Sequence, residues 1–144
     1  MNTTPKHIVV LGAAESGVGA AILAATNGLT VFVSDAGPIK DSAKMELEHY
    51  AIDFEEHGHT IDRVLTADLI VKSPGIPESA HIIKALRSAG VAIVSEIEFE
   101  TAYQISLIED NRTPSNIIED VIYHSVLEDM ELFGESLVHY LNTI

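Results

Sequence analysis

The sequence contains no cysteine and little positive charge. Without cysteine the chain can form no disulfide bond, no thiolate metal site and no thiol nucleophile. It has only 8 lysine and arginine residues against 22 aspartate and glutamate residues, which gives a formal net charge of −14. Binding to nucleic acid depends on basic side chains that neutralise phosphates, so this composition argues against a nucleic-acid partner.

Long apolar runs are also missing. No run approaches the length that crosses a membrane, and residues 1–6 are polar and lack the apolar core of a signal peptide. We therefore expect a cytoplasmic protein with no membrane partner. The hydrophobic content of 47% argues against a chain that is disordered throughout, and 144 residues suffice for one domain with a core.

Strand-like and helix-like patterns alternate over the first hundred residues. Strands separated by helices pair in parallel through right-handed crossovers, and continuously apolar strands fit a sheet that is covered on both faces. The sequence predicts an α/β fold, a Rossmann-like five-stranded parallel sheet of order 3-2-1-4-5. The expected strands are 7–11, 30–34, 52–55, 67–72 and 91–95; the expected helices are 16–27, 42–50, 61–65 and 79–89. In the second helix, Met45, Leu47 and Tyr50 are the apolar candidates.

The turn after the first strand is the strongest functional signal. Residues 12–19 (GAAESGVG) connect an apolar strand to a helix through small side chains. This arrangement lets a phosphate approach the backbone and sit at the positive end of the helix. The alternative is tight packing of the helix on the strand, with no ligand.

Two further segments are expected at the same edge of the sheet. Asp35 closes the second strand at about the distance where a nucleotide-binding fold places a ribose-binding carboxylate, although it could also only form a turn. Residues 73–77 (SPGIP) cannot be regular helix or sheet. We expect this segment to face residues 12–19 across a crevice, at the switch point between the first and fourth strands.

Other polar residues are weaker candidates for a catalytic or metal-binding role. Glu96, Glu98 and Glu100 alternate with apolar residues, and no reacting group is evident near them, so a solvated helix start is the preferred interpretation. His57 and His59 form a His-x-His pair with no clear third or fourth ligand, so we expect no metal site. No catalytic residue is assigned.

The last forty residues have a different pattern. Thr113-Pro114 is typical of a helix start, and the apolar residues that follow recur every three or four positions. These apolar positions are Ile118, Ile122, Val126, Met130, Phe133, Leu137 and Leu141. We therefore divide the chain into a Rossmann-like domain (1–102) and an acidic, amphipathic helical tail (103–144), whose apolar stripe packs on the core or on a second copy in a homodimer.

Four segments together resemble the N-terminal domain of the Mur ligases that add D-glutamate to the peptidoglycan precursor. They are residues 9–19 (VVLGAAESGVG), 33–35 (VSD), 72–77 (KSPGIP) and 95–99 (SEIEF), in the family's order. The resemblance covers roughly residues 5–101 and implies a domain that binds the UDP part of UDP-N-acetylmuramoyl-L-alanine. By position, it implies a diphosphate site at Ala14, Glu15, Ser16 and Gly17, and contacts to the nucleoside from Asp35, Ala36 and Gly75. Ala14 departs from the family's usual glycine.

The family's catalytic parts do not follow in this sequence. The phosphate loop expected after the Glu-Ile-Glu segment is absent, and Val18 stands where the loop-like spacing of Gly12 and Gly17 would need a lysine. The resemblance therefore implies ATP and Mg²⁺ only for a full-length family enzyme, and we expect no cofactor and no ligase activity for this chain by itself. A truncation, a frameshifted end or a joining of two pieces would each explain the unfamiliar tail.

Two other functions stay open at this point. The Gly-x-Ala-x-x-Gly turn with Asp35 could serve a dinucleotide such as NAD, in a dehydrogenase or a nucleotide sensor. The chain could also be a non-enzymatic module that dimerises through its tail helix.

Overall fold

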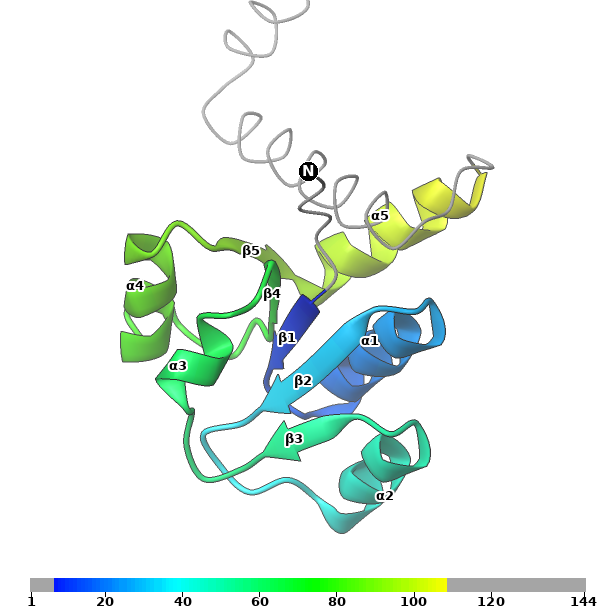
Figure 1. The fold of residues 1–144 in the computed structure, drawn as a ribbon, viewed down its shortest axis with the longest axis horizontal. Helices are drawn as coiled ribbons and strands as arrows, with labels where there is room; N and C mark the ends of the chain where they lie inside the picture. The colour runs from blue at the N-terminus through cyan, green and yellow to red at the C-terminus, as the bar shows by residue number, and fades with distance from the viewer. Residues whose placement is uncertain (1–6, 109–144) are drawn as a thin grey trace, which may run out of the picture.

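The computed structural model describes residues 7–108 and forms a five-stranded parallel sheet of order β3-β2-β1-β4-β5. This order is the one predicted from the sequence (Figure 1). The strands are β1 (His7–Leu11), β2 (Thr30–Ser34), β3 (Asp53–Glu55), β4 (Leu69–Lys72) and β5 (Ala92–Ser95). The helices are α1 (Glu15–Thr26), α2 (Asp41–His49), α3 (Ile61–Val64), α4 (His81–Ser88) and α5 (Glu96–Ile108).

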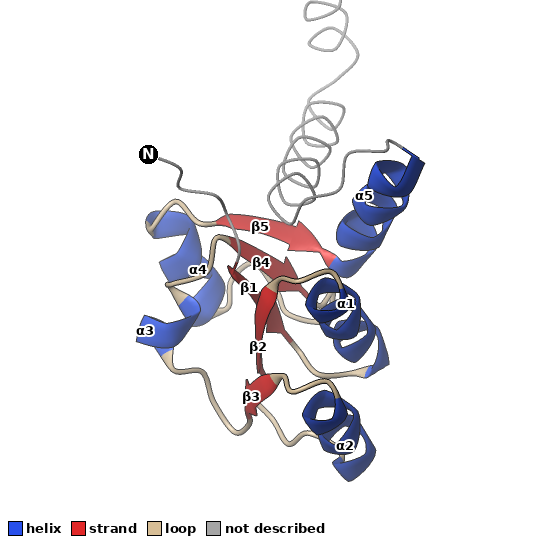
Figure 2. Ribbon diagram, turned by 45° about the vertical axis from the view of Figure 1, so that its right-hand side comes forward, coloured by secondary structure: helices blue, strands red, loops and turns tan. Residues whose placement is uncertain are grey.

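Helices cover both faces of the sheet. Helices α1, α2 and α5 lie on one face, and α3 and α4 lie on the other (Figure 2). Successive residues of a strand point to opposite faces. Ile8 and Val10 therefore pack on the side of α1, α2 and α5, while Val9 and Leu11 pack on the side of α3 and α4. Because both faces are covered, the central strands are apolar at nearly every position, as the sequence predicted.

Helix α1 ends where the sequence places a stop. Gly28 adopts a φ of +84°, which glycine reaches at little cost. Its N–H donates to the Ala25 carbonyl at 3.1 Å, and the N–H of Leu29 donates to the Ala24 carbonyl at 3.2 Å. These two bonds are the Schellman arrangement, which satisfies the last carbonyls of the helix.

Helix α2 buries one of the three apolar candidates named from its sequence. Only Leu47 of α2 is buried; Met45 is 70% exposed and Tyr50 is 42% exposed. Ala43 and Leu47, four residues apart, form the packed stripe, because i and i+4 lie on one face of a helix. Met45 lies on the opposite face of α2, so this apolar candidate does not pack in the core.

Helix α5 corrects the interpretation of the glutamates. The helix start is confirmed, but Glu96 is 3% exposed and therefore not solvated. Glu96, Phe99 and Tyr103 recur at helical spacing on the packed face, which Phe99 fills with no exposure. The alternation of charged and apolar residues suggested that all three carboxylates face water, whereas the helical period buries the first of them.

The tail prediction falls mostly beyond the described part of the chain. The boundary expected between residues 102 and 103 lies inside α5, and the hydroxyl of Tyr103 donates a 3.0 Å hydrogen bond to the side-chain oxygen of Asn27 in the turn after α1. Residues 109–144, with the predicted apolar stripe, lie outside the described residues. Within residues 7–108, no helix is both long enough and apolar enough to cross a membrane.

Candidate functional site

Strand register brings three loops together at one edge of the sheet. Leu11 pairs with Ser34 on β2 and with Lys72 on β4, so the three strands end level with one another. The next residues continue the ladder: the N–H of Gly12 donates to the Ser34 carbonyl at 2.9 Å, and the N–H of Ser73 donates to the Leu11 carbonyl at 3.0 Å. The loops that begin at residues 12, 35 and 73 therefore meet at the carboxyl ends of the strands, where open α/β sheets bind ligands.

Glycine is required at two positions of the turn after β1. Gly12 has a φ of +99°, and a Cβ there would lie 2.8 Å from the Cβ of Ser73. A Cβ on Gly17 would lie 2.0 Å from the carbonyl oxygen of Gly12, so α1 starts in direct contact with the turn. The expectation that residues 12–19 face residues 73–77 is confirmed by the approach of Gly12 to Ser73.

The first turn of α1 presents free backbone donors. Ala14 is the N-cap, and its side chain makes no capping hydrogen bond. The first backbone bond of the helix runs from the N–H of Val18 to the carbonyl of Ala14 at 3.0 Å. The N–H groups of residues 14–17 find no acceptor within residues 7–108. Such a cluster at the positive end of a twelve-residue helix suits an anion.

Ala14 needs no glycine-like backbone. Its φ of −73° and ψ of 177° are extended values that any residue adopts. The departure from the family's usual glycine therefore leaves the turn unstrained.

Asp35 joins the turn after β2 to the turn after β1. One carboxylate oxygen accepts the N–H of Ala13 at 2.8 Å, and the other accepts the N–H of Gly37 at 2.8 Å. The second bond forms an Asx turn, which is the structural role considered for this residue. Asp35 thus fixes the loop that carries Ala13 and Ala14, and each oxygen keeps one further lone pair.

A crevice pocket of about 570 Å³ opens between the loops after β1, β2 and β4. This volume suits a small organic ligand. It is lined by residues of four loops, those after β1, β2, β3 and β4, and of α3 and α4, namely Gly12, Ala14, Asp35, Ala36, His59, Ile61, Ser73, Gly75, Ile76, Pro77, Ala80, His81 and Ile82. Four of the seven predicted binding residues therefore meet here: Ala14, Asp35, Ala36 and Gly75.

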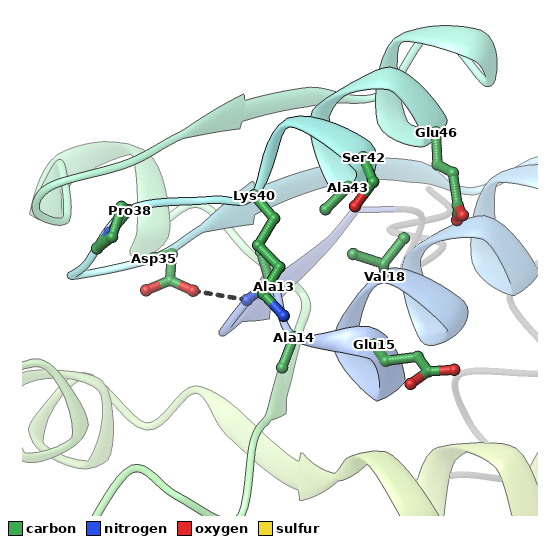
Figure 3. Close-up of a pocket in the computed structure, with 10 residues that line it drawn as sticks. All are labelled: Ala13, Ala14, Glu15, Val18, Asp35, Pro38, Lys40, Ser42, Ala43 and Glu46. Carbon is green, nitrogen blue, oxygen red and sulfur yellow. Dashed lines mark hydrogen bonds between the residues drawn. The ribbon is translucent and has the colours of Figure 1, made fainter.

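A second pocket lies across the turn, between α1 and α2 (Figure 3). Glu15 lines this pocket, while Ala14 and Asp35 line both. Lys40, the residue before α2, extends toward Ala14 in this view. Ser16 is exposed and Gly17 is buried, and neither lines the crevice pocket.

The segment after β4 is held in place by a lysine. The ammonium group of Lys72 donates to the carbonyl of Ile76 at 2.7 Å and to that of Ser73 at 3.4 Å. These bonds fix residues 73–77 as a rigid wall of the crevice pocket. They also engage the positive charge of Lys72 with backbone oxygens.

One polar network at the pocket was missed from the sequence. Buried Ser34 contacts both the Glu55 carboxylate, at 2.8 Å, and the Nδ1 atom of His59, at 2.6 Å. Burial would raise the pKa of the Glu55 carboxyl, but hydrogen bonds from Thr60 and Ser34 outweigh it and lower that pKa below its ordinary value. His59 had been considered only with His57 as a metal pair; instead, His57 lies 3.4 Å from Glu56. The sequence signal available was that Ser34 ends a strand at the ligand-binding edge.

The comparisons with known proteins point to one family. Residues 7–82 match the family model described as the MurD N-terminal domain. The chain is 56% identical over 103 residues to the UDP-N-acetylmuramoylalanine–D-glutamate ligase of Porphyromonas gingivalis, a match that covers 72% of the chain and 23% of the relative. It is 53% identical over 98 residues to the ligase of the same name from Bacteroides fragilis, covering 68% of the chain and 22% of that relative.

Solved structures show the same fold. A murein peptide ligase from Psychrobacter arcticus superposes with a TM-score of 0.59 at 28% identity, over 65% of this chain and 19% of that protein. The UDP-N-acetylmuramate:L-alanyl-γ-D-glutamyl-meso-diaminopimelate ligase from Neisseria meningitides has a TM-score of 0.58 at 22% identity, over 66% of this chain and 30% of that protein. The chain thus spans about a fifth of the length of the curated relatives that it matches.

Proposed function

The chain belongs to the MurD N-terminal domain family, and from this premise we propose that it binds the UDP part of UDP-N-acetylmuramoyl-L-alanine. The diphosphate lies at the first turn of α1, against the N–H groups of residues 14–17 and the hydroxyl of Ser16. The nucleoside lies in the crevice pocket, between Ala36 on one side and Gly75 on the other.

The unpaired donors at the start of α1 carry this proposal. Four backbone N–H groups with no acceptor within residues 7–108 open onto the carboxyl edge of the sheet. They attract an anion locally although the whole chain carries a charge of −14. The close approach of Gly12 to Ser73 forms one wall of the crevice pocket, so phosphate and nucleoside can be bound together.

The role of the chain is binding without ligation. The sequence contains no Gly-Lys-Ser or Gly-Lys-Thr phosphate loop, and without its lysine and hydroxyl there is no evident site for the γ-phosphate of ATP and its Mg²⁺. In a full-length family enzyme, ATP and Mg²⁺ would activate the substrate carboxylate before D-glutamate attacks it. We propose that this chain, in the cytoplasm, binds the UDP-sugar and does not perform that reaction.

A charge placed at the first turn of α1 tests the proposal. Ser16 is exposed and is the second residue of α1, where an aspartate is favourable to the helix. We expect Ser16→Asp to keep the thermal stability and to weaken UDP binding about tenfold or more through repulsion of the diphosphate. The dissociation constant of UDP is measured by amide NMR titration of both proteins.

Ser42→Asp is the matched control. Ser42 is the second residue of α2 and lines the second pocket, so the substitution adds the same charge at the same helix position on the other side of the turn. We expect a much smaller effect on UDP binding. Equal weakening by both variants would place the nucleotide between α1 and α2, and no weakening by Ser16→Asp would contradict a diphosphate site at this helix.

A further inference from the structure

His59 lies where a bound nucleoside would meet it. It follows β3 in the loop before α3, its ring is half-buried, and it lines the crevice pocket with Asp35 and Ala36. Its Nδ1 atom is 2.6 Å from the hydroxyl oxygen of Ser34. Among residues 7–108, its Nε2 atom has no hydrogen-bond partner.

A count of hydrogens places a hydrogen on the Nδ1 atom of His59. The Glu55 carboxylate accepts from the Ser34 hydroxyl at 2.8 Å, from the Thr60 N–H at 2.9 Å and from the Thr60 hydroxyl at 2.7 Å. An ionised carboxylate can only accept, so the single hydroxyl hydrogen of Ser34 points to Glu55. The hydrogen in the contact between Ser34 and His59 must therefore come from Nδ1. In the neutral ring, Nε2 then carries a lone pair and no hydrogen.

The neighbouring carboxylate is already occupied. Both oxygens of Asp35 accept backbone N–H groups, from Ala13 and from Gly37. Asp35 therefore serves first as the clamp between two loops. At the same pocket, the Nε2 atom of the neutral His59 ring is an acceptor that has no partner within residues 7–108. A ligand that covers this acceptor is favoured if it offers a hydrogen-bond donor there, since a buried acceptor or donor that is left unpaired costs free energy.

Given the proposed UDP site, we propose that His59 is a specificity-determining residue, whose Nε2 atom accepts a hydrogen bond from a donor of the nucleoside. We take this donor to be either the N3–H of the uracil ring or the 2′-hydroxyl of the ribose. The N3 atom of cytosine carries a lone pair and no hydrogen. If His59 Nε2 faces N3, two lone pairs oppose each other in a cytidine nucleotide, which weakens its binding. The Ser34–Glu55 pair positions the ring by holding the hydrogen on Nδ1.

The substitution His59→Asn separates the role of Nδ1 from the role of Nε2. The side-chain amide that it introduces can still donate an N–H to Ser34, as Nδ1 does, but it no longer reaches the position of Nε2. His57→Asn is the matched control, because His57 is an exposed histidine of the same loop whose φ of +63° asparagine tolerates. The full chain and both variants are titrated with UDP, CDP and 2′-deoxy-UDP by NMR.

We expect wild type to prefer UDP over one of the two analogues by about three- to tenfold, the worth of one hydrogen bond. Preference over CDP assigns the contact to N3–H; preference over 2′-deoxy-UDP assigns it to the 2′-hydroxyl. His59→Asn loses that preference, and His57→Asn keeps it. The proposal is overturned if wild type shows neither preference, or if His59→Asn keeps the preferences of wild type. If UDP does not bind wild type at all, the proposed function itself fails, and this inference fails with it.

A second readout needs no ligand. Long-range ¹H–¹⁵N NMR spectra of imidazole rings distinguish a hydrogen on Nδ1 from one on Nε2. We expect the Nδ1–H form for neutral His59 in wild type, and a mixture of forms in Ser34→Ala, which removes the hydroxyl acceptor. A wild-type ring with its hydrogen on Nε2 would overturn the proposal whatever the affinity for UDP.

Discussion

Two glycines of α1, two positions apart, have opposite roles. A Cβ on Gly17 would lie 2.0 Å from the Gly12 carbonyl oxygen, whereas a Cβ on Gly19 would meet no atom within 4 Å. Gly17→Ala must move the backbone of the turn, and we expect it to lower the free energy of unfolding by about 2 kcal/mol or more. Gly19→Ala, in an exposed helical position, should raise it by about 0.5–1 kcal/mol.

Urea unfolding of both variants checks this prediction, because the midpoint of each curve moves with stability. Equal effects of the two substitutions would contradict the close contact between the start of α1 and the turn.

At the residue scale, the sequence predicted some of the positions that line the pocket but not what each does there. Ala14, Asp35, Ala36 and Gly75, four of the seven positions named from the family resemblance, line the crevice pocket, whereas the other three do not. That Asp35 gives both oxygens to backbone N–H groups was not predictable, because the bond to Ala13 joins residues 22 positions apart. For the same reason the network around Ser34 was missed: its three members come from β2, β3 and the next loop.

Helix α5 begins with a reciprocal cap. The hydroxyl of Ser95 accepts the N–H of Glu98 at 3.1 Å, and the carboxylate of Glu98 accepts the N–H of Ser95 at 3.1 Å. This is a capping box, in which two otherwise unpaired donors of the first turn are satisfied. We expect Ser95→Ala to destabilise the chain by about 1 kcal/mol in urea unfolding. Glu100→Ala, on the exposed side of the same helix, should change stability little; an equal loss would contradict the cap.

At the element scale, all ten described elements were predicted as helix or strand correctly. Where both ends of an element were predicted, each end lies within two residues of the observed one. The strands were predictable because both faces of the sheet are covered, which makes each strand a continuous apolar run bounded by glycine or polar turns. Exposure was harder to predict. Met45 on α2 was named as an apolar candidate and Glu96 on α5 as a solvated residue, but the neighbour against which each helix packs decided their burial.

At the scale of the whole molecule, a strongly acidic chain is proposed to bind a dianionic group. Net charge acts over long distances and is screened by salt, whereas the N–H groups of α1 act within hydrogen-bond distance. The two are compatible, because the donors at residues 14–17 act at the start of α1, and Lys40 lines the neighbouring pocket between α1 and α2 together with Ala14 and Glu15. The fold supplies this arrangement through the strand order alone, which leaves β1 and β4 adjacent at the switch point.

The most direct test is an amide NMR titration of the full chain with UDP, UDP-N-acetylmuramoyl-L-alanine, NADH and ATP in parallel. If the chain binds UDP as proposed, we expect the amide resonances of Glu15, Ser16, Gly17, Asp35 and Gly75 to shift with the two UDP ligands and not with NADH or ATP. Shifts of the same residues with NADH but not with UDP would contradict the proposal and favour a dinucleotide-binding domain. The absence of a shift with all four ligands would also contradict the proposal. In that case the chain would have the fold of the family but would not bind its ligand.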